Sequence, residues 1–164
     1  MCNDEVLTED AKGDTSFSTE ICEAWENEAK EAEALGIRCC YLRTGIVLGN
    51  GGALSKMLPP FKFGLGGPMG TGKQYMSWIH MDDLVSMFVR AIEDEQVHGV
   101  FCGVGPTPVR NAEFTQTLGK ELGRPACLKA PRFALRLGLG EASSALVASQ
   151  RVRPLRWDAL GFEF

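Results

Sequence analysis

Two overlapping glycine-rich segments have residue types that could bind phosphate. Gly67-Pro-Met-Gly-Thr-Gly-Lys73 has the spacing of a P-loop, in which backbone N–H groups and a lysine hold phosphates. However, Gln74 stands where Ser or Thr would bind Mg²⁺, and the segment follows Pro59-Pro60 instead of a buried strand. Gly64-Leu-Gly-Gly67 forms part of a GxGxxG pattern, but Met69 replaces the last glycine. We therefore predict a mobile loop whose glycines provide backbone freedom and which covers a binding cleft.

Histidine and cysteine are the other side chains that could do chemistry. His80 could act as a base or a metal ligand, but His98 is the only other histidine, and the pattern favours a structural role at a strand end. Ser18, Cys22 and Glu26 share one helix face, and the surrounding carboxylates argue against a reactive thiol there. The six cysteines show no CxxC pair and no metal spacing.

Composition limits the class of protein. The 164 residues carry a net charge of −4, which argues against nucleic-acid binding, and no apolar segment is long enough to span a bilayer. Residues 1–35 are acidic and residues 124–156 are basic, a pattern typical of solvated faces. Cysteine usage favours a reduced intracellular protein. We expect a cytoplasmic location, with an organelle left open.

The elements that must position these residues alternate between helix and strand. Residues 1–13 are predicted to be a loop. Asp14, Thr15 or Ser16 would cap a helix that ends near Gly36. Strands are expected at 37–42, 46–48, 75–80 and 97–104. This alternation indicates an α/β fold.

The remaining predicted helices depend on cap and breaker residues. Pro59-Pro60 should end or kink a short helix at 54–58, and residues 64–73 should form a loop. Asp82 or Asp83 would cap a helix, and Asn111 would cap another that carries Phe114, Leu118 and Leu122. The first of these helices has a predicted apolar face of Leu84, Val85, Phe88, Val89 and Ile92. Two small helices at 131–138 and 141–150 would precede a basic loop, and Trp25, Trp78 and Trp157 are expected as core or interface anchors.

Five sequence blocks together resemble one known family. They are Arg43-Thr-Gly-Ile-Val-Leu-Gly, Gly52-Ala-Leu-Ser-Lys-Met-Leu-Pro-Pro-Phe, Gly64-Leu-Gly-Gly-Pro, Trp78-Ile-His-Met-Asp-Asp-Leu and Asn111-Ala-Glu-Phe. In this order they resemble the epimerase family, an atypical extended group of short-chain dehydrogenases/reductases. Its members carry a C-terminal domain of unknown function (DUF1731-like) and are described as cell-division-inhibitor-like. The resemblance covers nearly the whole chain.

The resemblance implies a nucleotide-cofactor fold of which this chain is the C-terminal half. The family has an N-terminal Rossmann unit that binds NADP(H) and a small mixed α/β substrate domain. Residues 1–50 would be the last helix and strand of the Rossmann-like core. Residues 51–164 would be the substrate and C-terminal domain with returning core elements, in one compact unit. No strand, glycine-rich turn and helix that could hold a pyrophosphate precede Tyr41.

The resemblance also bears on the chemistry. Related reductases use a Tyr and a Lys four residues apart for proton transfer, and the matching positions here are Ser18 and Cys22. Sugar-nucleotide epimerases carry a phosphate-binding Arg where this chain has Met76, so a nucleotide-sugar substrate is not supported. The family itself resembles this chain in lacking the Tyr–Lys pair. The catalytic residues are left unassigned.

The resulting hypothesis is an NADP(H)-binding oxidoreductase-like or epimerase-like protein whose reaction and substrate are unknown, and which is inactive as this chain alone. Cofactor contacts are assigned to Arg43, Thr44 and Gly45. The substrate-cleft residues are Gly66, Gly67, Lys73 and His80, and no metal is expected. The alternative is a non-catalytic cofactor-sensing or partner-binding module. A homodimer, or a second polypeptide that supplies the N-terminal half, is also left open.

Overall fold

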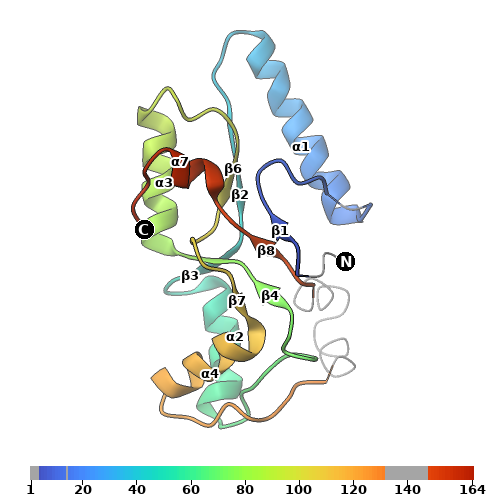
Figure 1. The fold of residues 1–164 in the computed structure, drawn as a ribbon, viewed down its shortest axis with the longest axis vertical. Helices are drawn as coiled ribbons and strands as arrows, with labels where there is room; N and C mark the ends of the chain where they lie inside the picture. The colour runs from blue at the N-terminus through green and yellow to red at the C-terminus, as the bar shows by residue number, and fades with distance from the viewer. Residues whose placement is uncertain (1–3, 14, 132–147) are drawn as a thin grey trace.

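A pair of parallel strands forms the centre of the upper part of the molecule in Figure 1. The computed structural model describes residues 4–13, 15–131 and 148–164. β2 (Cys40–Thr44) pairs with β6 (Gly99–Gly103) in parallel, from Cys40 opposite Gly99 to Thr44 opposite Gly103. Their carboxyl ends therefore lie at the same edge, as in the α/β class that the sequence predicts.

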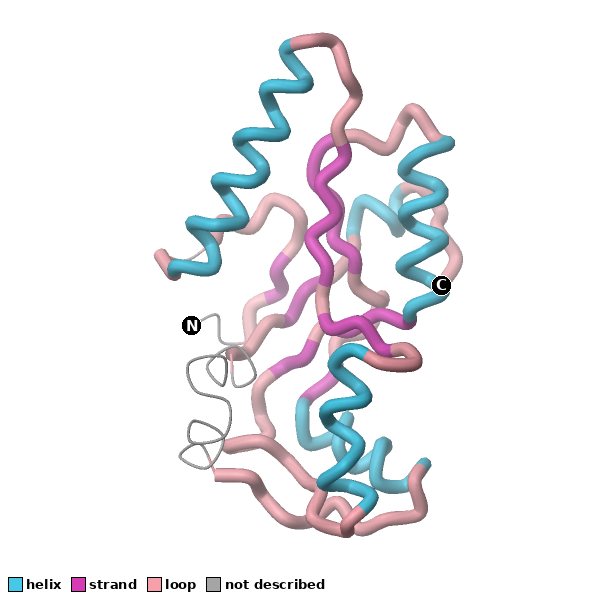
Figure 2. Tube along the Cα trace, turned by 180° about the vertical axis from the view of Figure 1, so that it is seen from behind, coloured by secondary structure: helices cyan, strands magenta, loops and turns pink. Residues whose placement is uncertain are grey.

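One helix lies on each side of this strand pair (Figure 2). α1 (Phe17–Ala34) begins after Ser16, whose side chain accepts a hydrogen bond from the Thr19 N–H at 3.3 Å. It ends next to Gly36, whose φ of +79° is a conformation that glycine adopts readily. The predicted helix and both of its end signals are confirmed.

α3 (Met81–Glu93) packs on the other side of the pair, but with a different face from the predicted one. Leu84, Met87 and Ala91 are buried and contact the core residues Ile79, Val97, Phe101 and Trp157. Of the predicted apolar face, only Leu84 is buried, and Val85, Phe88, Val89 and Ile92 are exposed. Apolar residues cover most of this helix, so periodicity alone could not select the side that faces the core.

The predicted strand at 75–80 is two strands that separate at Ser77. β4 (Tyr75–Met76) pairs antiparallel with β7 (Val109–Arg110), while β5 (Trp78–His80) pairs in parallel with β3 (Ile46–Leu48). The buried Ser77 hydroxyl donates to the Gln150 carbonyl at 2.7 Å and accepts from the Val152 N–H at 2.9 Å. These side-chain bonds let the strand change partners at this residue.

α2 (Gly52–Lys62) continues through Pro59 and Pro60, so of the two predicted effects, an end at residue 58 or a kink, the end is wrong. Each proline removes one helical hydrogen bond, but both lie in the last turn and a half. Phe61, which follows them, is buried and holds this end of the helix against the protein.

α4 (Asn111–Glu121) differs from its prediction at its N-terminus. Its N-cap position is Arg110, and Asn111 is the first helical residue and fully buried. Asn111 accepts from the Met69 N–H at 2.8 Å and donates to the Met76 sulfur at 3.0 Å, so it joins the helix to neighbouring segments and does not cap it. The buried face consists of Asn111, Thr115 and Gly119.

The first and last described segments lie side by side in the middle of Figure 1. β1 (Val6–Leu7) pairs in parallel with β8 (Arg151–Val152), and α7 (Leu155–Ala159) follows β8 and buries Trp157. The predicted loops at 1–13 and after residue 150 therefore contain short regular elements, and the core role of Trp157 is confirmed. The two small helices predicted at 131–138 and 141–150 fall mostly in residues 132–147, outside the described residues.

Candidate functional site

The carboxyl edge of the β2–β6 pair holds the three residues assigned to cofactor contacts. In α/β sheets, ligands bind outside the carboxyl ends of parallel strands. Thr44 is the last residue of β2 and is exposed. Gly45 donates its N–H to the Gly103 carbonyl at 3.0 Å, and a Cβ at this position would lie 2.5 Å from the Ser77 carbonyl oxygen. Close packing therefore explains the glycine at position 45.

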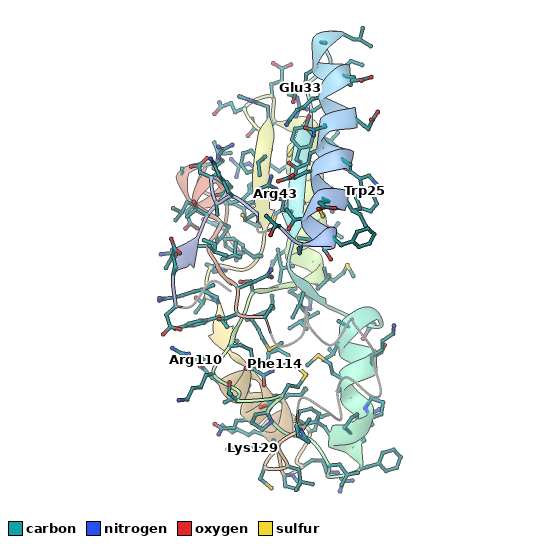
Figure 3. The ribbon with its side chains drawn as sticks, turned by 90° about the vertical axis from the view of Figure 1, so that its right-hand side faces the viewer. Trp25, Glu33, Arg43, Arg110, Phe114 and Lys129 are labelled. Carbon is teal, nitrogen blue, oxygen red and sulfur yellow. The ribbon has the colours of Figure 1, made fainter. Side chains whose placement is uncertain are left out.

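Arg43 is already engaged by an acidic residue of α1. Its Nε and Nη2 atoms each donate to one oxygen of Glu26 at 2.7 Å, a bidentate pair. The hydrogen bond from Arg43 lowers the pKa of Glu26 from its usual value, while partial burial acts in the opposite direction. Figure 3 shows Arg43 on the side of α1 that faces β2, with Trp25 on the outer side. The sequence placed Glu26 on a helix face with Ser18 and Cys22, but did not identify Arg43 as its partner.

Two further hydrogen bonds join α1 to β2 and the residue before it. The Tyr41 hydroxyl donates to Glu33 at 2.9 Å, and the Cys39 thiol donates to the Ala29 carbonyl at 3.5 Å. Desolvation, followed by the hydrogen bond with Glu33, raises the pKa of Tyr41 to about 12. Tyr41 is therefore held as a neutral phenol in a structural contact.

The cysteines of this region show no arrangement for metal binding or nucleophilic attack. Cys102 is buried on β6, and burial, followed by the charge of Glu9, raises the pKa of its thiol to about 12. Cys22 is exposed on α1. In residues 4–13, 15–131 and 148–164, no group of three or more His, Cys, Asp or Glu side chains could hold a metal ion.

The loop at 64–73 is confirmed as a loop, but its central glycines have another role than the predicted one. Gly64, Gly70 and Gly72 have positive φ, which agrees with backbone freedom. By contrast, a Cβ on Gly66 would overlap the Phe61 ring, and one on Gly67 would overlap the backbone of the segment at 128–130. That segment donates to this loop through its Leu128 and Ala130 N–H groups, so Gly66 and Gly67 permit close packing.

The two remaining substrate-cleft candidates lie on different elements. His80 is the N-cap of α3, and its Nδ1 atom accepts from the Asp82 N–H at 3.3 Å. The predicted cap at Asp82 or Asp83 is therefore wrong by two or three residues, and the structural role of His80 is confirmed. Lys73 is exposed, and its carbonyl accepts a hydrogen bond from Arg110. No hydrogen bond among the described residues joins Thr44, Lys73 and His80 to one another.

A cluster of aromatic and basic side chains beside Lys73 was not predicted as a site. The guanidinium carbons of Arg110 and Arg151 lie 4.4 Å and 5.0 Å from the centre of the Tyr75 ring. Arg110 also forms an ion pair with Asp4 at 2.9 Å. The sequence offered only a weak signal for this cluster, because the basic residues after position 124 resemble a solvated tail.

Two open hollows occur elsewhere on the described part of the protein. One, of about 520 Å³, lies between α3 and the C-terminal residues and includes Val89, Arg90 and Phe162 in its lining. The other, of about 370 Å³, includes Glu33, Arg38 and His98 near the amino ends of β2 and β6. Neither is lined by a predicted site residue. None of the described helices has the length and apolar character needed to cross a membrane.

Comparison with known proteins matches this architecture to one group. Residues 130–164 match a family model described as a domain of unknown function, DUF1731. The chloroplastic SDR39U1 homolog of Arabidopsis thaliana, an epimerase family protein, is 42% identical over 97% of this chain and 46% of the relative. Human epimerase family protein SDR39U1 is 40% identical over 93% of this chain and 52% of the relative.

Solved structures agree with the sequence comparison. The crystal structure of human SDR39U1 (isoform 2) with NADPH is 37% identical and has a TM-score of 0.87, over 98% of this chain and 55% of that chain. A nucleoside-diphosphate sugar epimerase from Corynebacterium glutamicum is 34% identical, with a TM-score of 0.76, over 99% of this chain and 31% of that chain. The Rossmann-type short-chain reductase fold predicted from the sequence is therefore confirmed.

The chain spans about half the length of the curated relatives it matches. Within that span, the sequence similarity extends over nearly the whole of this chain, and the fold agrees with that of the relatives of known structure. The chain belongs to the epimerase family of short-chain dehydrogenase/reductase-like proteins.

Proposed function

We propose that this chain forms one wall of an NADP(H) site in an epimerase-like or oxidoreductase-like protein. The observation that carries the proposal is the match over 98% of the chain to a relative crystallised with NADPH. Thr44 and Gly45, with Arg43 held by Glu26, would contact the cofactor at the carboxyl edge of β2. In this role the Glu26 carboxylate fixes the position of the Arg43 guanidinium.

The substrate would bind on the side of this edge that faces the loop at 64–73. Lys73 supplies an exposed side chain there, and Gly66 and Gly67 set the path of the loop by packing closely against Phe61 and Leu128. His80 has one ring nitrogen engaged as the cap of α3, which leaves Nε2 for a substrate. The reaction is unassigned, because Ser18 and Cys22 cannot perform the proton transfer of a Tyr–Lys pair.

A complementary nucleotide-binding half would complete this site. β2 pairs only with β6 among the described strands, so its other edge carries unpaired backbone groups. Two large apolar side chains of α1 are also uncovered, with Phe17 76% exposed and Trp25 72% exposed. The free edge of β2 and these two side chains are the surfaces that such a half would cover. The chain alone should therefore not catalyse turnover.

The test is a thermal melt of the purified chain with and without NADPH. Ligand that binds only the folded state raises the melting midpoint. NADPH should raise the midpoint of the wild type and of the control Thr117→Arg, an exposed position on α4, but not that of Thr44→Arg. An equal response of all three proteins, or no response of the wild type, would contradict the assignment of β2 to the cofactor. NADPH-dependent turnover of a carbonyl substrate by the chain alone would contradict its inactivity.

The alternative is a module that senses cofactor or binds a partner without chemistry. Of the three candidate proton donors, Tyr41 donates its hydroxyl to Glu33, the Tyr75 ring contacts two guanidinium groups, and His80 has one of its two ring nitrogens engaged as a helix cap. The same melt separates this alternative when it is combined with a turnover assay of an intact relative. A cofactor response without turnover on any carbonyl substrate would favour the sensing module.

A further inference from the structure

We propose that Tyr75, Arg110 and Arg151 form a binding site for an anionic small molecule, and that the Asp4 carboxylate occupies this site in the present structure. The group recognised would be a carboxylate or a phosphate. The inference names the chemical class of the substrate in the proposed function. It rests on that function only for the statement that the bound anion is a substrate. Anion binding itself can be measured without NADPH.

Three short strands bring the site together. The antiparallel register of β4 and β7 places Tyr75 directly opposite Arg110. Arg151 is brought alongside because the Gln150 N–H donates to the Tyr75 carbonyl at 3.2 Å. The guanidinium groups then lie within 4.4 Å and 5.0 Å of the same aromatic ring, where cation–π attraction holds them.

The positive charge of this cluster is only partly compensated. Arg110 donates to the Asp4 carboxylate at 2.9 Å, whereas Arg151 donates to the Asp4 backbone carbonyl at 3.2 Å. Among the described residues, Arg151 has no carboxylate within ion-pair distance. The cluster therefore has two guanidinium groups but only one paired carboxylate, and an anion with more than one oxygen could contact both.

The Asp4 contact is of the kind that a ligand can displace. The Asp4 side chain is 67% exposed, and exposed ion pairs contribute little to stability. Arg110 is held independently, because it also donates to the Lys73 carbonyl and lies against Tyr75. A guanidinium that is already oriented loses little side-chain freedom when it binds an anion.

The location fits a substrate site. Arg110 lies in the lower part of Figure 3, well separated from Arg43 beside α1. The cluster therefore lies apart from the proposed cofactor residues and next to Lys73, the exposed residue of the predicted substrate cleft.

The experiment is a calorimetric titration of the whole chain with pyrophosphate and, separately, with citrate at low salt. Asp4→Asn removes the competing carboxylate and should tighten binding by about fivefold. The matched control Asp10→Asn, which removes an exposed carboxylate paired with Arg156, should leave the affinity unchanged. The anion that shows the larger difference between these two variants identifies phosphate or carboxylate as the preferred group.

A second pair of variants tests the basic residues. Arg151→Gln should weaken binding by about tenfold, as for the loss of a charged hydrogen-bond donor. Arg153→Gln, which removes a guanidinium paired with Asp158, should not. Equal effects of Asp4→Asn and Asp10→Asn, or of the two arginine variants, would overturn the site in favour of general charge attraction.

Two further outcomes complete the test. If Arg151→Gln does not fold, the comparison of Asp4→Asn with Asp10→Asn decides the proposal. Absence of binding of both anions to Asp4→Asn would overturn it. Because no step requires NADPH, an anion site without a cofactor response would refute the proposed function and leave this inference standing.

Discussion

Individual residues of this protein often act through one specific partner that lies far away in the sequence. Glu26 and Arg43 are 17 residues apart and form a bidentate ion pair. Asn111 and Met69 are 42 residues apart, and Tyr75 and Arg151 are 76 apart in the numbering. Sequence patterns within a helix or strand contain no information on such pairs. For that reason, the sequence suggested Arg43 and Lys73 as site candidates but did not indicate that Glu26 and Arg110 form hydrogen bonds with them.

At the residue scale, we predict a pH-dependent contribution of Glu26 to stability. Arg43 lowers the pKa of Glu26 in the folded state below its ordinary value of 4.5. The stabilisation is therefore present above pH 4.5 and is lost as the pH falls through the lower folded-state pKa. Glu26→Gln should lower the free energy of unfolding by about 0.5–1 kcal/mol at pH 7, since Arg43 is partly exposed. Below the folded-state pKa, the two proteins should unfold alike.

Urea denaturation at pH 7 and near pH 3 measures this difference. The control is Glu28→Gln, an exposed carboxylate on the same helix with no ion-pair partner among the described residues. A pH-independent effect of Glu26→Gln would show that the pair contributes through packing and not through charge.

At the scale of elements, the sequence predicted the bounds of a helix correctly where cap and stop residues mark both of its ends. α1 has a serine cap and a terminal glycine, and its bounds follow from them. For α2 and α3, tertiary contacts determine the helix length and the buried face. α3 has apolar side chains on most of its surface, so only its packing partners select the buried face. α2 continues through two prolines because Phe61 is buried beyond them.

The packing of the loop at 64–73 gives an element-scale prediction. Gly67→Ala should lower the free energy of unfolding by about 1–3 kcal/mol, because the added Cβ would overlap the backbone of Leu128. Leu65→Ala, at an exposed position in the same loop, should change it by less than about 0.5 kcal/mol. Chemical denaturation of both variants provides the comparison. A wild-type stability for Gly67→Ala would mean that the segment at 128–130 moves without cost.

At the scale of the whole molecule, the described chain leaves large apolar surfaces uncovered. α1 buries no residue completely, and α3 exposes a stripe that includes Phe88 and Ile92. Parallel sheets are normally buried on both faces, and two strands form a small sheet. These features agree with a chain that spans about half the length of its relatives. The sequence predicted the fold class through its motifs, but the exposed surfaces became evident only from the arrangement of the elements.

We predict that the outer face of α1 promotes association. The double variant Phe17→Ser/Trp25→Ser should reduce self-association in light scattering and leave the free energy of unfolding within about 0.5 kcal/mol of wild type. The contrasting variant Trp157→Ser removes a buried indole and should cost about 3–5 kcal/mol. If the double variant destabilises the isolated chain to a similar extent, α1 is packed against the protein by its outer face.

The side-by-side placement of β1 and β8 has a consequence for co-translational folding. Residues 6–7 wait for residues 151–152, and the core around β6 and α3 stays open until Trp157 has been added. Until Trp157 has been added, the nascent chain therefore exposes Phe101, Ile79 and Met87. Such apolar surface is what chaperones bind, so newly made chains should depend on them until the segment that carries Trp157 has left the ribosome.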